Sequence, residues 1–200
     1  MKEVLIATNN PGKAREFEAL FHSKGYDIKT LKDFPEVPEI AETGTTFREN
    51  ALIKASTLSK ILNKMVLADD SGLKVEALNG EPGVYSARYA GLQKDDQANN
   101  DKLLRNLKGV PLTQRTAHFH CTLALVAPGK EDLVVFGEVP GVILEEPRGK
   151  NGFGYDPLFY VPELGQTMGE MSQEEKNKIS HRAAALQKLE EQWEDWIKNE

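Results

Sequence analysis

The stretch Val4-Leu5-Ile6-Ala7-Thr8-Asn9-Asn10-Pro11-Gly12-Lys13 decides the fold class. Its apolar residues run directly into a Thr-Asn-Asn-Pro-Gly turn, which predicts a buried strand over 4–7 that ends in a loop. Asn10 suits the N-cap of a following helix, Pro11 its first position and Gly25 its end. A buried strand followed by a helix is the usual opening of an α/β fold.

Apolar patterns further along the chain predict more strands and helices in alternation. Two capping boxes, Thr46-Phe47-Arg48-Glu49 and Ser172-x-x-Glu175, each predict the start of a helix. Alternating apolar residues over 115–127 and 133–144 predict a long antiparallel hairpin. Further strands are expected at 26–31, 65–68, 73–78 and 158–161, further helices at 95–107 and from residue 180, and loops at 33–44 and 69–72. The sequence therefore predicts an α/β fold with a mixed sheet flanked by helices, in one domain over residues 1–200.

Composition excludes several classes of protein. The chain has 200 residues, of which 40% are apolar and 28% charged, as in an ordinary globular domain. Its net charge of −6 argues against binding to long nucleic acids, which favour a basic excess. The lone Cys121 allows no intrachain disulfide and indicates a reducing compartment. The opening MKEVLIATNN is too short in its apolar part for a signal peptide, and no apolar run approaches a membrane span, so we expect a cytoplasmic location.

The first candidate site is the loop over residues 8–13. A helix N-terminus after a strand offers unpaired backbone N–H groups and a positive dipole end to an anion. Thr8 and Asn10 add side-chain donors, and Lys13 adds a full charge. The alternative is a capped turn with a solvated lysine. The loop is not a P-loop, because no Gly-Lys pair in the chain is followed by Ser or Thr.

The second candidate is Asp69-Asp70-Ser71-Gly72 together with Glu42. Adjacent carboxylates at the end of an apolar strand are costly unless a cation accompanies them. Mg²⁺ carried by substrate phosphates would serve, since it takes one or two carboxylates plus phosphate oxygens. The alternative is an Asx turn closed by Gly72.

Two further segments carry groups that suit a flat, polar ligand. In Gly152-Phe153-Gly154-Tyr155-Asp156-Pro157, glycines around an aromatic ring allow close approach, and Asp156 could accept hydrogen bonds from a base edge. Lys176 and the segment Ser180-His181-Arg182 lie near a helix start and could converge on an anion or a carbonyl. Each segment by itself is equally compatible with a structural loop or a solvated helix start.

Taken together, these segments resemble the inosine triphosphate pyrophosphatase family, whose members hydrolyse deaminated purine nucleoside triphosphates such as ITP, dITP and XTP. The matching blocks are ATNNPGK (7–13), ETGTTFRENALIKA (42–55), ADDSGLKVEALNGEPGVYSARYAG (68–91), GFGYDPLF (152–159) and EKNKISHRAAAL (175–186). They span the chain in the family's order. The family is often doubly acidic just before Thr43, whereas here Ala41 precedes Glu42.

The resemblance implies an elongated two-lobed α/β fold around a cleft, a homodimer, and Mg²⁺ (or Mn²⁺) as cofactor. It implies cleavage of a nucleoside triphosphate to the monophosphate and pyrophosphate, with metal ligands at Glu42, Asp69 and Asp70. The implied substrate-binding residues are Thr8, Asn9, Asn10, Pro11, Gly12, Lys13, Ser71, Phe153, Gly154, Tyr155, Asp156, Lys176, His181 and Arg182. Because in-line hydrolysis needs an activated water, we expect Asp70 to act as the general base.

Two other functions compete with this interpretation. The first is a nucleotide-binding regulatory module without turnover. The acidic residues argue against it, because carboxylates beside a triphosphate repel it unless a metal intervenes. An aspartyl-phosphate phosphatase would use Asp69 as nucleophile, but such enzymes favour an acid two residues later, where this chain has Ser71.

Overall fold

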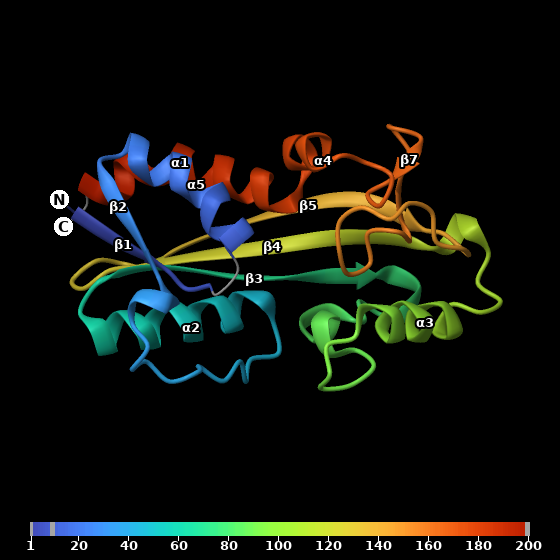
Figure 1. The fold of residues 1–200 in the computed structure, drawn as a ribbon, viewed down its shortest axis with the longest axis horizontal. Coiled ribbons are helices and arrows are strands. Elements are labelled where there is room, and N and C mark those ends of the chain that lie inside the picture. The colour runs from blue at the N-terminus through green and yellow to red at the C-terminus, as the bar shows by residue number, and fades with distance from the viewer. Residues whose placement is uncertain (1, 9–10, 199–200) are drawn as a thin grey trace. The chain divides into compact units, whose positions relative to one another are not determined.

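A computed structural model describes residues 2–8 and 11–198 (Figure 1). Strands and helices alternate along the chain, as the sequence predicted. The strands are β1 Lys2–Ile6, β2 Tyr26–Thr30, β3 Met65–Val75, β4 Thr116–Val126, β5 Leu133–Ile143, β6 Phe159–Val161 and β7 Gln166–Thr167. The helices are α1 Pro11–Ser23, α2 Phe47–Leu62, α3 Asp96–Asn106, α4 Gln173–Ile179 and α5 His181–Lys198. None of the described helices is long and apolar enough to cross a membrane.

The strands of the described residues form one mixed sheet in the order β2-β1-β3-β4-β5-β6-β7. β1 pairs in parallel with both β2 and β3, whereas β5–β6 and β6–β7 are antiparallel. β4 and β5 are neighbours joined by residues 127–132. A connection this short requires an antiparallel hairpin. The predicted α/β fold with a mixed sheet is confirmed.

The chain divides into two compact units, each built from several segments. Unit 1 comprises residues 1–70, 122–136 and 185–200, and unit 2 comprises residues 71–121 and 137–184. β3, β4 and β5 each contribute one part to either unit. The arrangement of two lobes around a cleft stays a prediction.

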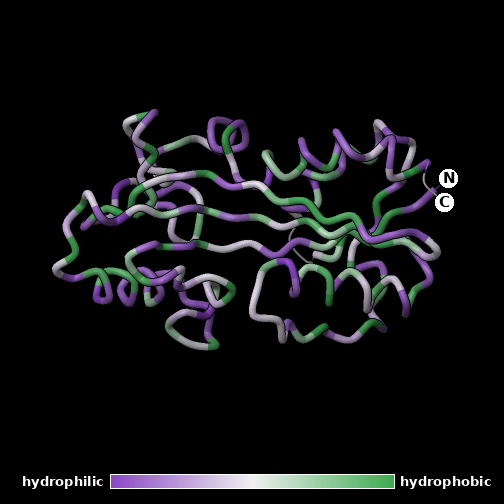
Figure 2. Tube along the Cα trace, turned by 180° about the vertical axis from the view of Figure 1, so that it is seen from behind, coloured by the Kyte–Doolittle hydropathy of each residue, from purple (hydrophilic) through white to green (hydrophobic). Residues whose placement is uncertain are grey.

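In unit 1, helices cover both faces of the strands (Figure 1). On one face, α1 and α5 meet through the rings of Phe21 and Trp193, whose centroids lie 5.6 Å apart. On the other face, Ala51, Ala55 and Leu58 of α2 pack in a cluster with residues of β1, β3 and β4. The strands between these helices are predominantly hydrophobic (Figure 2). Burial on both faces explains why they read as continuous apolar runs.

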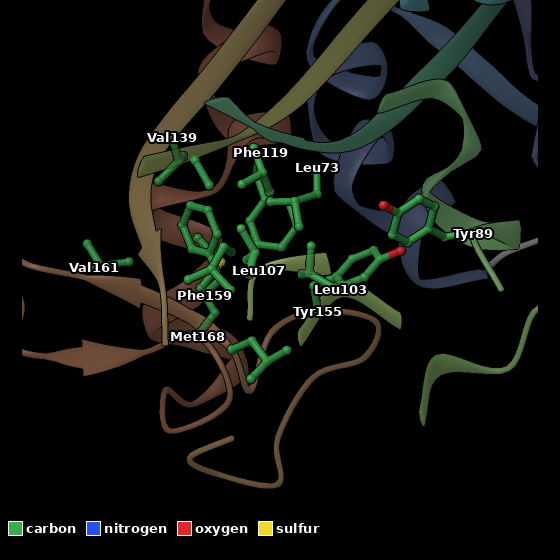
Figure 3. Packing of buried hydrophobic residues seen from close by; sticks show 14 of the residues in the cluster. Leu73, Tyr89, Leu103, Leu107, Phe119, Val139, Tyr155, Phe159, Val161 and Met168 are labelled. Carbon is green, nitrogen blue, oxygen red and sulfur yellow. The ribbon is translucent and has the colours of Figure 1, made fainter. Parts of the chain in front are cut away.

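Unit 2 has a hydrophobic cluster of its own (Figure 3). Leu103 and Leu107, at the end of α3, pack there with Phe119 of β4 and Phe159 of β6. The rings of Phe119 and Phe159 lie 4.3 Å apart between centroids. This core anchors α3 beside the loop that precedes β6.

The path of β3 differs from the sequence prediction. We expected a strand to stop at Asp69 and a turn to follow over 69–72, but β3 runs unbroken from Met65 to Val75. The turn preference of Asp69-Asp70-Ser71-Gly72 does not decide the structure here, because β3 lies between β1 and β4 and pairs with a strand on each edge. The strand also ends earlier than the expected Leu78, in a 3₁₀ turn over Glu76–Leu78. The two acids therefore lie within the sheet rather than in a loop.

Candidate functional site

The loop between β1 and α1 contributes one charged group to unit 1. Thr8 is buried, and Lys13 lies in the first turn of α1, which carries no acidic residue there. Nζ of Lys13 lies 2.8 Å from Oδ2 of Asp69. Asn9 and Asn10 fall outside the described residues, and Pro11 and Gly12 begin α1. A positive helix end with a lysine therefore lies beside the first carboxylate of the acidic pair.

A second lysine joins the other carboxylates of unit 1. Nζ of Lys54 forms an ion pair with Glu42 and donates a hydrogen bond to the backbone oxygen of Asp69 at 2.9 Å. Burial alone would lower the pKa of Lys54, but the charges of Asp69 and Glu42 outweigh it and raise the pKa. Lys54 thus links the Glu42 side chain to the backbone of Asp69, while their joint role as metal ligands stays a prediction.

Asp70 is the least compensated member of this acidic cluster. It is only 9% exposed, and its Oδ2 is buried without a hydrogen-bond partner among the described residues. Burial raises the pKa of Asp70 to about 7, and the nearby charge of Glu42 adds to the rise. Lys54 and Asn50 offset part of it, although Asn50 Nδ2 makes no well-formed hydrogen bond in the described part of the chain. A carboxyl group with a pKa near neutrality suits proton transfer.

Sequence reasoning missed Asn50 and Lys54 as members of the site. Asn50 is fully buried, and its Oδ1 accepts a hydrogen bond from the backbone N–H of Gly44 at 2.7 Å. It thereby ties the loop that carries Glu42 to α2. A signal was present, because the two residues are four apart on α2, interleaved with the buried Ala51 and Ala55. Polar side chains inside an apolar helical stripe indicate a buried polar site.

The donor set of this cluster fits a hard divalent cation that shares ligands with a substrate. Among residues 2–8 and 11–198, no three His, Cys, Asp or Glu side chains are gathered closely enough to form a complete metal cage. Mg²⁺ does not need one, because it usually takes one or two carboxylates and completes its shell with water and phosphate oxygens. The Asp70 carboxylate offers oxygens of the required type, and its buried Oδ2 accepts no hydrogen bond from the described residues.

In unit 2, residues 152–156 form a tight loop with an exposed aromatic ring. Gly152 has a φ of +73°, and a Cβ there would lie 2.0 Å from Oδ2 of Asp156, so only glycine fits. That same Oδ2 accepts the backbone N–H of Phe153 at 3.0 Å. The Phe153 side chain is left 62% exposed. An exposed ring on a hydrogen-bonded loop provides a surface on which a base can stack.

Lys176 of α4 completes the support of this loop. Its Nζ lies 2.5 Å from Oδ2 of Asp156, and both side chains are less than a tenth exposed. Nζ also lies 4.5 Å from the centroid of the Phe153 ring. Oδ2 of Asp156 therefore already accepts two hydrogen bonds within the protein. Lys176 and Asp156 are together, as the resemblance implied, but Asp156 first of all holds the loop.

Tyr155 is placed differently from the other residues of the loop. Its ring lies in the hydrophobic cluster of unit 2 (Figure 3), and its hydroxyl donates to the backbone oxygen of Ser86 at 2.6 Å. Burial raises the pKa of Tyr155 far above the usual range. The side chain is thus a core anchor, so any contact of Tyr155 with a ligand must come from its backbone.

His181 and Arg182 open α5, whose first turn is capped by the Ser180 hydroxyl, accepting from the N–H of Ala183 at 3.1 Å. The His181 ring stacks on Phe119 with a centroid separation of 5.3 Å, and Arg182 is buried. Both side chains belong to the same unit as Phe153. Ser71 directly follows Asp70 within β3 and is half-buried.

The loop has few backbone donors to spare for a ligand. The N–H groups of Phe153, Gly154 and Asp156 donate to Asp156 Oδ2, to Asp96 Oδ2 and to the Phe153 carbonyl, respectively. These groups cannot donate to a base at the same time. A backbone donor from this loop to a nucleobase would therefore have to be Gly152 or Tyr155.

The chain is similar to known proteins over nearly its whole length. The sequence model of the Ham1 family matches residues 4–192. A dITP/XTP pyrophosphatase from Geobacillus kaustophilus (strain HTA426) is 60% identical over 98% of this chain and 97% of its own length. One from Bacillus subtilis (strain 168) is 58% identical over 94% and 96%. The solved structure of the Staphylococcus aureus Ham1 protein has a TM-score of 0.91 at 47% identity and covers 97% of this chain and 99% of its own.

Proposed function

This chain belongs to the Ham1 family, and we propose that it hydrolyses deaminated purine nucleoside triphosphates, dITP, ITP and XTP, to the monophosphate and pyrophosphate. Its relatives at 54–60% identity are named dITP/XTP pyrophosphatases. Removal of such nucleotides keeps them out of DNA and RNA. The observation that carries the proposal is Asp70, a buried carboxyl group poised near neutral pKa among acids and lysines.

The groups of unit 1 suit the triphosphate. The N-terminus of α1 offers backbone N–H groups and a positive dipole end that suit an anion. We assign Thr8, Pro11 and Gly12 to the triphosphate, together with Asn9 and Asn10, which fall outside the described residues. Lys13 and Lys54 now pair with Asp69 and Glu42, and their flexible stems allow them to donate to phosphate oxygens instead. Ser71, the first residue of unit 2, adds a hydroxyl next to Asp70 in the sequence.

Asp70 acts in this proposal as the base that orients and deprotonates the attacking water. With a pKa of about 7, its carboxylate is present at neutral pH and is basic enough to accept a proton. Its unsatisfied Oδ2 leaves one oxygen available for that contact. The proton moves from the water to this oxygen as the water attacks in line with the departing pyrophosphate.

Glu42, Asp69 and Asp70 would hold Mg²⁺, or Mn²⁺ in its place, together with substrate oxygens. When bound, such an ion neutralises phosphate charge and makes a coordinated water more acidic. The carboxylates would then have two roles. They hold the cation, and they repel a triphosphate that no cation accompanies.

The groups of unit 2 suit the base. Phe153 would stack on the purine, and His181 and Arg182 would donate hydrogen bonds to its 6-oxo group. Adenine carries an amino group at that position, so donor would meet donor and leave buried polar groups unpaired. Lys176 holds the loop through Asp156, and the absence of a side chain at Gly154 lets the base approach the loop closely.

We also propose a homodimer, for which the solution mass would be twice the 22.3 kDa of one chain.

The test is a panel of nucleoside triphosphates incubated with Mg²⁺, with the products identified. We expect ITP, dITP and XTP to give monophosphate plus pyrophosphate, and ATP and GTP to be spared. Orthophosphate with a diphosphate would contradict the assigned bond. Binding without turnover would indicate a regulatory module, and a trapped phospho-enzyme on Asp69 would indicate an aspartyl-phosphate mechanism.

A further inference from the structure

Gly154 is held on both sides by α3. Its backbone N–H donates to Oδ2 of Asp96 at 2.7 Å, and its carbonyl oxygen accepts from Nδ2 of Asn100 at 2.9 Å. The two side chains are four positions apart and so lie on the same face of the helix. One helix therefore satisfies the donor and the acceptor of a single glycine more than fifty positions away in the chain.

The helix that holds Gly154 is itself firmly anchored. Leu103 is fully buried in the cluster of unit 2. Asn99 is also buried, and its side chain accepts from the N–H of Ala90 at 2.7 Å and donates to the oxygen of Ala87 at 3.1 Å. Asp95, rather than Asp96, is the N-cap that accepts from Ala98. Asp96 is therefore not the cap, and it contributes to the helix only through its negative charge in the first turn.

The ring of Phe153 is exposed, yet the backbone on either side of it is tied down. Its own N–H is bound by Asp156, and the next residue is bound by α3. A glycine-flanked loop without these bonds would sample many conformations, and a ligand would have to select one of them at a cost in affinity. Bonds that fix the loop before binding remove that cost.

We propose that Asp96 and Asn100 are positioning residues that present Phe153 to the purine. This inference rests on the proposed function, because it assigns Phe153 to the base. Neither residue touches the reacting phosphates in this scheme. Their loss should weaken the recognition of the base and leave the chemical step intact.

The experiment compares Asp96→Ala and Asn100→Ala with the control Gln97→Ala. Gln97 lies in the same turn, is exposed, and its side chain donates to Asp101 on its own helix. We expect KM for ITP to rise about tenfold in either variant, with kcat within about twofold of the wild type, as loss of preorganisation predicts. The control should match the wild type in both constants.

A double-mutant cycle with Phe153→Ala separates positioning from a general structural effect. If Asp96 and Asn100 act through the ring, removing them in the Phe153→Ala background should change KM no further. An equal rise in both backgrounds, a lower kcat with KM unchanged, or no change at all would overturn the positioning role. Hydrogen exchange at Gly154 without nucleotide should quicken in Asp96→Ala, and protection as in the wild type would also count against it. A wild-type protein that leaves ITP intact would instead overturn the proposed function.

Discussion

Asp70 owes its chemistry to its surroundings rather than to its residue type. The change Asp70→Asn keeps the size of the side chain but removes the base, so we expect turnover of ITP to fall by roughly 10²–10⁴-fold, the range for general base catalysis. Circular dichroism should show an intact fold. A folded variant with near-normal turnover would move the role of base to Asp69 or Glu42.

The same variant should reveal the cost of burying this carboxylate. The pKa of Asp70 is raised to about 7 in the folded protein, so the native state binds the proton more tightly than the unfolded chain. Wild-type stability should therefore fall, relative to Asp70→Asn, as pH rises from about 4 to about 7, and level off above that. The difference should reach at most about 4 kcal/mol, at 1.36 kcal/mol for each pKa unit. Urea unfolding in the presence of a chelator measures it; a difference constant between pH 4 and pH 8 would show that the pKa is not raised.

Arg182 carries the prediction on selectivity. Arg182→Ala should reduce ITP turnover and narrow the ratio of ITP to ATP activity, because a buried carbonyl loses a donor worth on the order of 1–3 kcal/mol. The ratio of ITP to GTP should change less, since both bases carry the 6-oxo group. Lys178→Ala, an exposed cation on α4, is the control. A common loss on all triphosphates would mean that Arg182 binds phosphate.

At the scale of elements, a capping box begins α2, the helix that carries Asn50 and Lys54 of the candidate site. The Thr46 hydroxyl accepts from the N–H of Glu49 at 3.1 Å, and Glu49 accepts from the N–H of Thr46 at 3.2 Å. Thr46→Ala should lower the free energy of unfolding by about 1 kcal/mol, the usual worth of an N-cap. Arg48→Ala, exposed in the same turn, is the control for denaturant melts. Equal stability of the two variants would show that the cap contributes nothing.

At the scale of the whole molecule, the proposed metal site predicts that activity depends on a cation. In the proposed mechanism Glu42, Asp69 and Asp70 repel the triphosphate unless a cation accompanies it, so exhaustive chelation should abolish turnover, and Mg²⁺ or Mn²⁺ should restore it. Pyrophosphate release before and after chelation, with a Ca²⁺ addition for comparison, is the measurement. Full activity in chelator would rule out the metal-dependent mechanism.

The sequence by itself determined the features that depend on residues a few positions apart. The capping boxes at Thr46 and Ser172 join residues three apart, and both are present as predicted. Apolar periodicity likewise marked the strands and the helix faces, and the order of strands and helices identified the α/β class. These features need no knowledge of which segments meet, because their hydrogen bonds and burial patterns are local.

Only the tertiary structure decided what depends on distant neighbours. The turn expected over 69–72 became part of β3 because two strands pair with its edges. Lys13 reaches Asp69 across 56 positions, and Asp96 reaches Gly154 across 58. Tyr155 became a core residue although its motif suggested a ligand contact. Burial and pairing shift a pKa or occupy a donor only once remote segments are packed together, and spacing along the chain carries no record of that packing.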